Sequence, residues 1–322
     1  MGFGRYSHDA HKALTSARSR SSNSEVFGQS GCHELMNPFQ VKVRESRDSE
    51  AHPQSLGIIF ALDVSGSMGE IPAELAKNTL PDFMQAMLDA GITDPQVLFM
   101  GIGHAESDSA PLQVGQFESS EKLMDQWLTS LFLEGGGGGG NESYELAMYF
   151  AARHTDMDCL KKRYRRGYLF ITGDEPPNPA VSRTQVKRII GDDLGKDIPI
   201  ADMIEELQRS YEPFYLIPDP ERGQSVGRAW RDLLGDRVIV MESPDDTSYA
   251  AAGLVSLLEE AVPSLGALVQ KLQKAGVSAE QANRIGKALT GFAAALQRDG
   301  SPRPTLKPTE LSDRDESSGF GR

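Results

Sequence analysis

An apolar run that ends in a D-x-S-x-S motif constrains the fold of this chain more than any other feature. Residues 56–62 read Leu-Gly-Ile-Ile-Phe-Ala-Leu, and Asp63-Val64-Ser65-Gly66-Ser67 follows directly. An apolar run bounded by a turn signal predicts a buried strand, and the pattern over 71–90 predicts a helix. A carboxylate and two hydroxyls are therefore expected at the carboxyl end of a strand, where open α/β sheets bind ligands. All three side chains offer oxygen, the donor that suits Mg²⁺.

Strands and helices alternate through the middle of the chain. Further strands are predicted at 96–103, 167–172, 213–217 and 238–241, with a short edge strand within 107–120, and further helices at 121–132, from 141 onward, 200–210, 226–234 and 248–261. Pro81 is expected to kink or split the helix over 71–90, and Gly91 to end it. This alternation predicts an α/β fold, a doubly wound, mostly parallel Rossmann-like sheet with helices on both faces. The right-handed crossover rule places the loops after its strands at one edge.

The two ends of the chain differ in composition from the predicted domain at 56–262. Residues 1–55 form a polar extension, in which Cys32, Leu35, Met36, Phe39 and Val41 offer enough apolar surface to dock on the domain. Short ordered pieces are expected at 10–17 and 38–43. Residues 263–298 predict a C-terminal helical extension, a pair of helices, and residues 299–322 predict a disordered tail.

The strand, the D-x-S-x-S motif and the following helix resemble a von Willebrand factor A domain, in its intracellular bacterial-type branch. In that family the motif is the first part of a metal-ion-dependent adhesion site. The two serine hydroxyls bind the metal directly there, and the Asp acts through water. The resemblance implies that Asp63, Ser65 and Ser67 belong to a site for Mg²⁺ or Mn²⁺.

The third loop of the family site carries an Asp after a strand, in the order T-D-G. This chain has Thr172-Gly173-Asp174-Glu175 instead, an order similar to the G-D-x-P-P of the von Willebrand-like domain of some alpha-kinases. Asp174 is the candidate by its position, and Glu175 stays open as the carboxylate that faces the metal.

The second loop of the family site supplies a Thr after two glycines, and here the chain departs from the family. A run of six glycines, 135–140, is followed by Asn141, Glu142 and Ser143. Any of these three side chains is a candidate replacement for the Thr, and we favour Glu142. The glycine run lacks the Lys-Ser/Thr of a phosphate-binding loop, so nucleotide binding is not the leading hypothesis.

The composition of the chain limits the classes of partner that it is expected to bind. The net charge is −13, and the acidic excess lies in the predicted domain rather than at the ends, which argues against binding a nucleic-acid backbone. No stretch approaches the ~20 apolar residues of a membrane span, and two cysteines make no disulfide framework. These features predict a cytoplasmic protein.

The function that this pattern favours is metal-dependent protein–protein interaction, as an intracellular scaffold or adaptor. The resemblance implies a protein partner such as an AAA+ ATPase of the MoxR type, beside which intracellular bacterial relatives often work. Two other classes stay open: a metal-assisted hydrolase or phosphoryl-transfer enzyme, and a structural subunit of a larger assembly. His104, near the predicted ligand edge, is more simply explained as a loop residue than as a catalytic base, so an enzyme is the minority hypothesis.

Overall fold

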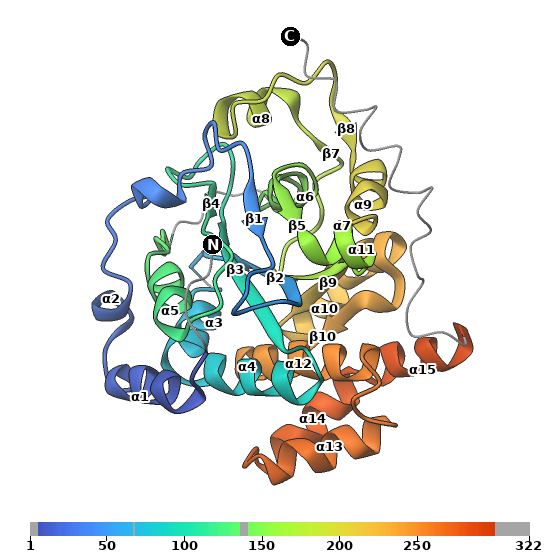
Figure 1. Cartoon of the computed structure of the whole chain (residues 1–322). Helices are drawn as coiled ribbons and strands as arrows, with labels where there is room; N and C mark the ends of the chain where they lie inside the picture. Colours follow the sequence, from blue (N-terminus) through green and yellow to red (C-terminus); the bar gives the residue numbers. More distant parts are fainter. Residues whose placement is uncertain (1–5, 67, 136–140, 300–322) are drawn as a thin grey trace.

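The computed structural model describes residues 6–66, 68–135 and 141–299. Its centre is a six-stranded sheet, which is flanked by helices (Figure 1). The strand order is β10-β9-β6-β2-β3-β4, and every pairing is parallel except that of β4 with β3. The strands are β2 (Ser55–Asp63), β3 (Asp94–Ile102), β4 (Leu112–Val114), β6 (Gly167–Thr172), β9 (Tyr211–Ile217) and β10 (Val238–Val240). The predicted doubly wound α/β fold is confirmed. Strand β2 lies between β6 and β3 in the sheet.

Helices connect and flank these strands. They are α3 (Glu70–Glu74), α4 (Leu80–Asp89), α5 (Glu121–Thr129), α6 (Tyr144–Arg153), α7 (Asp158–Arg163), α8 (Arg183–Ile189), α9 (Ile200–Gln208), α10 (Pro220–Ser225), α11 (Gly227–Leu234) and α12 (Thr247–Leu258). Two small sheets stand apart from the central one: β1 (Arg44–Ser46) with β5 (Thr155–Met157), and β7 (Ala180–Val181) with β8 (Ile198–Pro199). These short strands were not predicted, because pieces of two or three residues carry no readable periodicity.

A row of phenylalanines crosses one face of the central sheet. Four of them occupy matched register positions on neighbouring strands: Phe99, Phe60, Phe170 and Phe214. Their adjacent ring centroids lie 6.1, 5.3 and 5.7 Å apart. Phe83 of α4 meets Phe60 edge-on at 4.9 Å. Aromatic pairs at such distances contribute about 0.5–1.5 kcal/mol each beyond burial, so this row fixes strand register and holds α4 on the sheet.

Pro81 divides the helical segment that follows β2, as predicted. A π-helical turn (Leu75–Thr79) separates α3 from α4, and Pro81 stands in the first turn of α4. In a continuous α-helix the ring of Pro81 would collide with the carbonyl of Lys77. The wider π turn removes that conflict. Gly91, at φ 79°, adopts the left-handed backbone that ends the segment.

The N-terminal segment packs on the rest of the chain. Helix α1 (His8–Arg18) lies against α4 and the π turn (Figure 1), and the side chain of Met36 is fully buried. Leu35 and Phe39, also expected to dock, remain 57% and 48% exposed. The apolar surface of residues 6–55 is thus only partly used in contacts with the domain.

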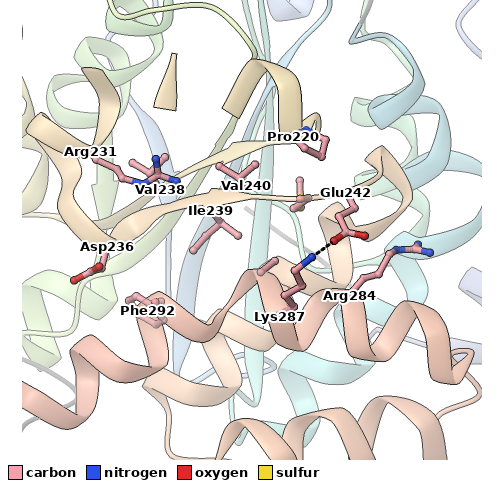
Figure 2. A pocket seen from close by; sticks show the side chains of 13 residues that line it. Pro220, Arg231, Asp236, Val238, Ile239, Val240, Glu242, Arg284, Lys287 and Phe292 are labelled. Carbon is pink, nitrogen blue, oxygen red and sulfur yellow. Dashed lines mark hydrogen bonds and ion pairs between the residues drawn. The ribbon is translucent and has the colours of Figure 1, made fainter. Parts of the chain in front are cut away.

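Three helices, rather than the predicted pair, follow α12. They are α13 (Leu265–Lys274), α14 (Ala279–Ala288) and α15 (Thr290–Asp299). Leu289, with ψ near 0°, ends α14 and separates it from α15. A pocket of about 610 Å³ lies between β10 and the helices α14 and α15 (Figure 2). At this pocket Lys287 donates a hydrogen bond to Glu242 at 2.6 Å. The predicted tail lies outside the described residues, apart from Asp299.

Among the described residues, every helix is too short or too polar to cross a membrane.

Candidate functional site

Asp63 is the last residue of β2 and anchors the candidate site at the carboxyl edge of the sheet. Its backbone N–H donates to the hydroxyl of Thr172, on the neighbouring strand β6, at 3.2 Å. Its Oδ1 accepts the Ser65 N–H at 2.9 Å, and its Oδ2 accepts the Tyr144 hydroxyl at 2.8 Å. Both carboxylate oxygens are therefore oriented by neighbours, and the side chain is buried. Ser65 is also buried; Ser67, the third residue of the motif, lies outside the described residues.

Burial raises the pKa of Asp63 to about 6, against the hydrogen bonds from Ser65 and Tyr144 that favour the charged form. The carboxylate of Asp174 raises that pKa further. A buried carboxyl with this pKa holds its negative charge at an energetic cost at neutral pH.

The second loop, which begins with the glycine run at Gly135, contacts the first loop, which carries the D-x-S-x-S motif. The carbonyl oxygen of Gly135 lies 3.2 Å from the position where Gly66 would carry a Cβ, so the start of the glycine run touches the D-x-S-x-S turn. The rest of the run, 136–140, lies outside the described residues. Glu142 follows it and is 8% exposed.

Glu142 belongs to the same electrostatic cluster as Asp63. Burial raises its pKa to about 7, and the next cause is the charge of Asp63, with further increases from Glu175 and Asp174. Its Oε2 is buried and has no hydrogen-bond partner among the described residues.

The other two candidates of the second loop have different surroundings. Ser143 accepts the Ala105 N–H through its hydroxyl and donates its own N–H to the Gly103 carbonyl, both at 3.0 Å. These bonds tie the beginning of α6 to the loop after β3. Asn141 is half-exposed. Glu142 stays our favoured replacement for the family Thr.

The third loop leaves β6 beside Asp63. Asp174 is buried, whereas the side chain of Glu175 is 27% exposed. Asp174 raises the pKa of both Asp63 and Glu142. It remains the candidate at this position, with Glu175 beside it.

A side chain at position 173 would collide with two tyrosines. A Cβ at position 173 would lie 2.4 Å from the hydroxyl of Tyr215 and 2.5 Å from the ring of Tyr144. Those distances are far below van der Waals contact, so the aromatic neighbours admit only glycine here. The acidic residues Asp174 and Glu175 follow this glycine.

Three aromatic side chains support the loops from the face of the sheet opposite the phenylalanine row. Tyr144 packs edge-on against Tyr215 at 5.4 Å and Trp230 at 5.8 Å, and Tyr215 stacks on Trp230 at 3.9 Å. Tyr215 and Trp230 both donate hydrogen bonds to the Glu175 carbonyl, at 3.1 and 3.0 Å. The sequence interpretation missed this aromatic cluster, because its members come from α6, β9 and α11 and share no local pattern.

Arg222, on α10, was also not singled out from the sequence. Its Nε lies 3.5 Å from Asp174 Oδ2, and its Nη2 lies 3.6 Å from Glu175 Oε1. A positive charge thus stands at the rim of the carboxylate cluster.

His104 follows β3 and is held within its own loop. Its Nδ1 lies 2.7 Å from the Ser107 hydroxyl and accepts the Ser107 N–H at 3.2 Å. The backbone N–H of His104 donates to Asp108 at 2.8 Å. These contacts agree with the interpretation of His104 as a loop residue.

The oxygen atoms of this candidate site are of the chemical type that a hard divalent cation prefers. Asp63, Glu142 and Asp174 are clustered carboxylates, and Glu142 keeps a buried oxygen without a partner among the described residues. Among those residues, however, no group of three or more His, Cys, Asp or Glu side chains is arranged to hold an ion by itself. A cation here would need hydroxyl or water oxygens in addition, as Mg²⁺ usually does.

Comparison with known proteins finds likeness in structure only. No family model matches the sequence, and no curated protein matches it. Among solved structures, the pilus adhesin SpaC from Lactobacillus rhamnosus GG, in its open conformation, is 11% identical, with a TM-score of 0.43 over 66% of this chain and 31% of that chain.

Two further solved structures are similar at the same level. Proximal thread matrix protein 1 from the mussel byssus is 12% identical, with a TM-score of 0.39 over 66% of this chain and 49% of that chain. A von Willebrand factor type A structure from Catenulispora acidiphila is 12% identical, with a TM-score of 0.32 over 69% of this chain and 48% of that chain. The matched region spans less than half of each of these solved chains.

Proposed function

We propose that this chain is a divalent-cation-dependent protein-interaction module. In this proposal Asp63, Ser65 and Ser67 of the first loop, Glu142 of the second and Asp174 of the third hold Mg²⁺ or Mn²⁺. The bound cation neutralises the carboxylates, and the loops around it present a surface to a partner protein.

One observation carries the proposal. Carboxylates from three separate loops interact electrostatically at the carboxyl edge of the sheet: Asp174 raises the pKa of Asp63, and Asp63 and Asp174 both raise the pKa of Glu142. Like charges brought together in a buried site are unfavourable without a counter-charge, and a divalent cation supplies one. Perturbed carboxyl groups of this kind concentrate at functional sites.

The chemistry of the second loop bears on how a partner is recognised. A carboxylate at Glu142, in place of a neutral hydroxyl, adds negative charge beside the cation. The cation is then held more tightly and attracts an acidic group of a partner less. We therefore propose recognition of the partner by the protein surface around the site, in an intracellular scaffold or adaptor role with an AAA+ ATPase of the MoxR type as the partner to test first.

The first experiment measures whether the folded protein binds the cation. A ligand that binds only the native state raises the thermal midpoint. We expect Mg²⁺ and Mn²⁺ to raise the midpoint of the full chain in calorimetry and Asp63→Ala to abolish that gain. Asp232→Ala, at an exposed position on α11, is the matched control and should keep it. A wild-type midpoint that is indifferent to both cations would refute the proposal.

The second experiment assigns the second loop. We expect Glu142→Ala to weaken Mn²⁺ binding in calorimetric titration, and Asn141→Ala to leave it unchanged. Ser143→Ala should lower the thermal midpoint through loss of its bond to Ala105 while it leaves the affinity unchanged. Equal affinity in all three variants would mean that the loop supplies no side-chain ligand.

The third experiment concerns the partner. Purification of the tagged wild type with Mg²⁺, and of Asp63→Ala beside it, followed by mass spectrometry, should give a protein that is retained only by the wild type. Direct binding of that protein after purification would then be measured with Mg²⁺ and with a chelator. Equal binding in the two conditions would contradict a cation-dependent module.

A further inference from the structure

Arg222 is attached to a closely packed backbone, and its side chain is partly exposed. The side chain of Asp219 caps α10 by accepting the N–H groups of Glu221 and Arg222, at 2.7 and 3.4 Å. Gly223 packs so closely on β10 that a Cβ there would lie 2.4 Å from Val240. The Arg222 side chain itself is 46% exposed, so its guanidinium can leave the site without movement of the helix.

The two contacts of Arg222 with the site are ion pairs rather than tight hydrogen bonds. The distances of 3.5 Å to Asp174 and 3.6 Å to Glu175 exceed the usual range for N–H···O bonds. A bidentate Arg–carboxylate pair would be shorter and harder to displace. The guanidinium therefore acts here mainly by its charge.

That charge is directed at a carboxylate that the cation also needs. Asp174 contacts Arg222 and also interacts electrostatically with Asp63 and Glu142, whose pKa values it raises. A divalent cation drawn to Asp174 is repelled by a guanidinium at the same carboxylate.

We propose that Arg222 is the built-in counter-ion of the carboxylate cluster and competes with the divalent cation for Asp174. This inference rests on the proposed function, because it concerns the same site. Without the cation, Arg222 partly neutralises Asp174 and Glu175. Cation binding displaces the guanidinium toward solvent, so the affinity of the site is set lower than its carboxylates alone would give.

The test compares variants in calorimetric titration with Mn²⁺ at an ionic strength of about 0.15 M. Arg222→Ala should bind Mn²⁺ about tenfold more tightly than the wild type, the size expected for removal of a unit charge a few ångströms from the ion in a water-like surrounding. Arg222→Lys, which keeps the charge, should stay close to the wild type. Arg228→Ala makes the same change of charge at an exposed position on the neighbouring helix α11 and should change the affinity less than twofold.

A purely structural role for Arg222 predicts the opposite change in Mn²⁺ affinity for Arg222→Ala. If Arg222 served to orient Asp174 for the ion, Arg222→Ala would bind Mn²⁺ more weakly, and that result, or an unchanged affinity, would overturn the inference while the proposed function stands. Failure of both the wild type and Arg222→Ala to bind Mn²⁺ would overturn both. Thermal melting supplies a second measurement: Arg222→Ala should melt lower than the wild type in a chelator and gain more from Mn²⁺. Arg222→Gln replaces the alanine variant if that one does not fold.

Discussion

Glu145 provides a direct test of the electrostatics beside the candidate site. It lies in the first turn of α6, is 1% exposed, and accepts a hydrogen bond from Asn178 at 3.0 Å through Oε2. Its Oε1 is buried without a hydrogen-bond partner among the described residues. Burial, the largest cause, raises its pKa from 4.5 to about 7.

The sign follows from which state binds the proton more tightly. Because the pKa is higher in the folded protein, the protonated carboxyl stabilises the fold fully below about pH 4.5, and this contribution disappears as the pH rises through 7. The difference between a pKa of 4.5 and one of about 7 corresponds to roughly 3 kcal/mol. Of this, about 2 kcal/mol should be lost between about pH 5.5 and pH 8.5.

The substitution Glu145→Gln removes this titration and keeps an acceptor for Asn178. Urea unfolding in a chelator, at several pH values, measures the free energy of unfolding of both proteins. Asp63 and Glu142 titrate in each of them, so the difference between the two curves isolates Glu145. We expect the variant to gain about 2 kcal/mol on the wild type between about pH 5.5 and pH 8.5. Glu205→Gln, on the exposed side of α9, is the control and should follow the wild type; a pH-independent difference for Glu145→Gln would refute the reasoning.

Four further predictions concern the site and the N-terminal segment. Gly173→Ala should lower the free energy of unfolding by about 1–3 kcal/mol in urea melts, because its methyl group enters aromatic side chains; an unchanged value would contradict the steric argument. Tyr144→Phe removes a hydrogen bond to a buried carboxylate and should cost about 2 kcal/mol at pH 8, with a smaller loss at pH 5, where Asp63, whose pKa is about 6, is mostly protonated. Mn²⁺ affinity should rise from pH 5.5 to pH 8 as Asp63 and Glu142, with pKa values of about 6 and 7, lose their protons; a pH-independent titration would argue against both as ligands. Met36→Ala should cost about 3 kcal/mol, since the side chain is fully buried, and a neutral result would mean that the N-terminal segment does not stabilise the domain.

The sequence predicted those parts of the fold that have strong local signals. Strand β2 was predicted within one residue at each end, because seven consecutive apolar residues stop at an acidic turn. The break near Pro81 followed from the chemistry of proline alone. The short β1–β5 pairing was not predictable in this way, since it joins residues more than a hundred positions apart. The N-terminal segment likewise depends on contacts that only the folded chain brings together.

In the candidate site, too, the residues with a local sequence signal were predicted and the others were not. Asp63, Glu142 and Asp174 were named from the sequence because each follows a strand or a glycine run, which are local features, and the structure places their charges within reach of one another. Their roles as metal ligands stay predictions. Arg222 was not named, because nothing in the residues around it points to β6.

The displaced acid of the third loop shows why sequence order alone is an incomplete guide to such a site. The resemblance in sequence leads one to expect an acid directly after Thr172, whereas Gly173 stands there and Asp174 follows. In the folded chain the atoms of Tyr144 and Tyr215 fill the space that a side chain at position 173 would need. Tyr144 also donates to Asp63, so the residue that excludes a side chain from the third loop orients the carboxylate of the first. Positions 144 and 173 are linked: a smaller residue at 144 would remove one of the two clashes that a side chain at 173 meets, the one with the Tyr144 ring, but would lose the hydrogen bond that holds Asp63. The double variant Tyr144→Ala/Gly173→Thr should therefore be more stable than the sum of its single variants implies, and additive effects in a double-mutant cycle would disprove the linkage.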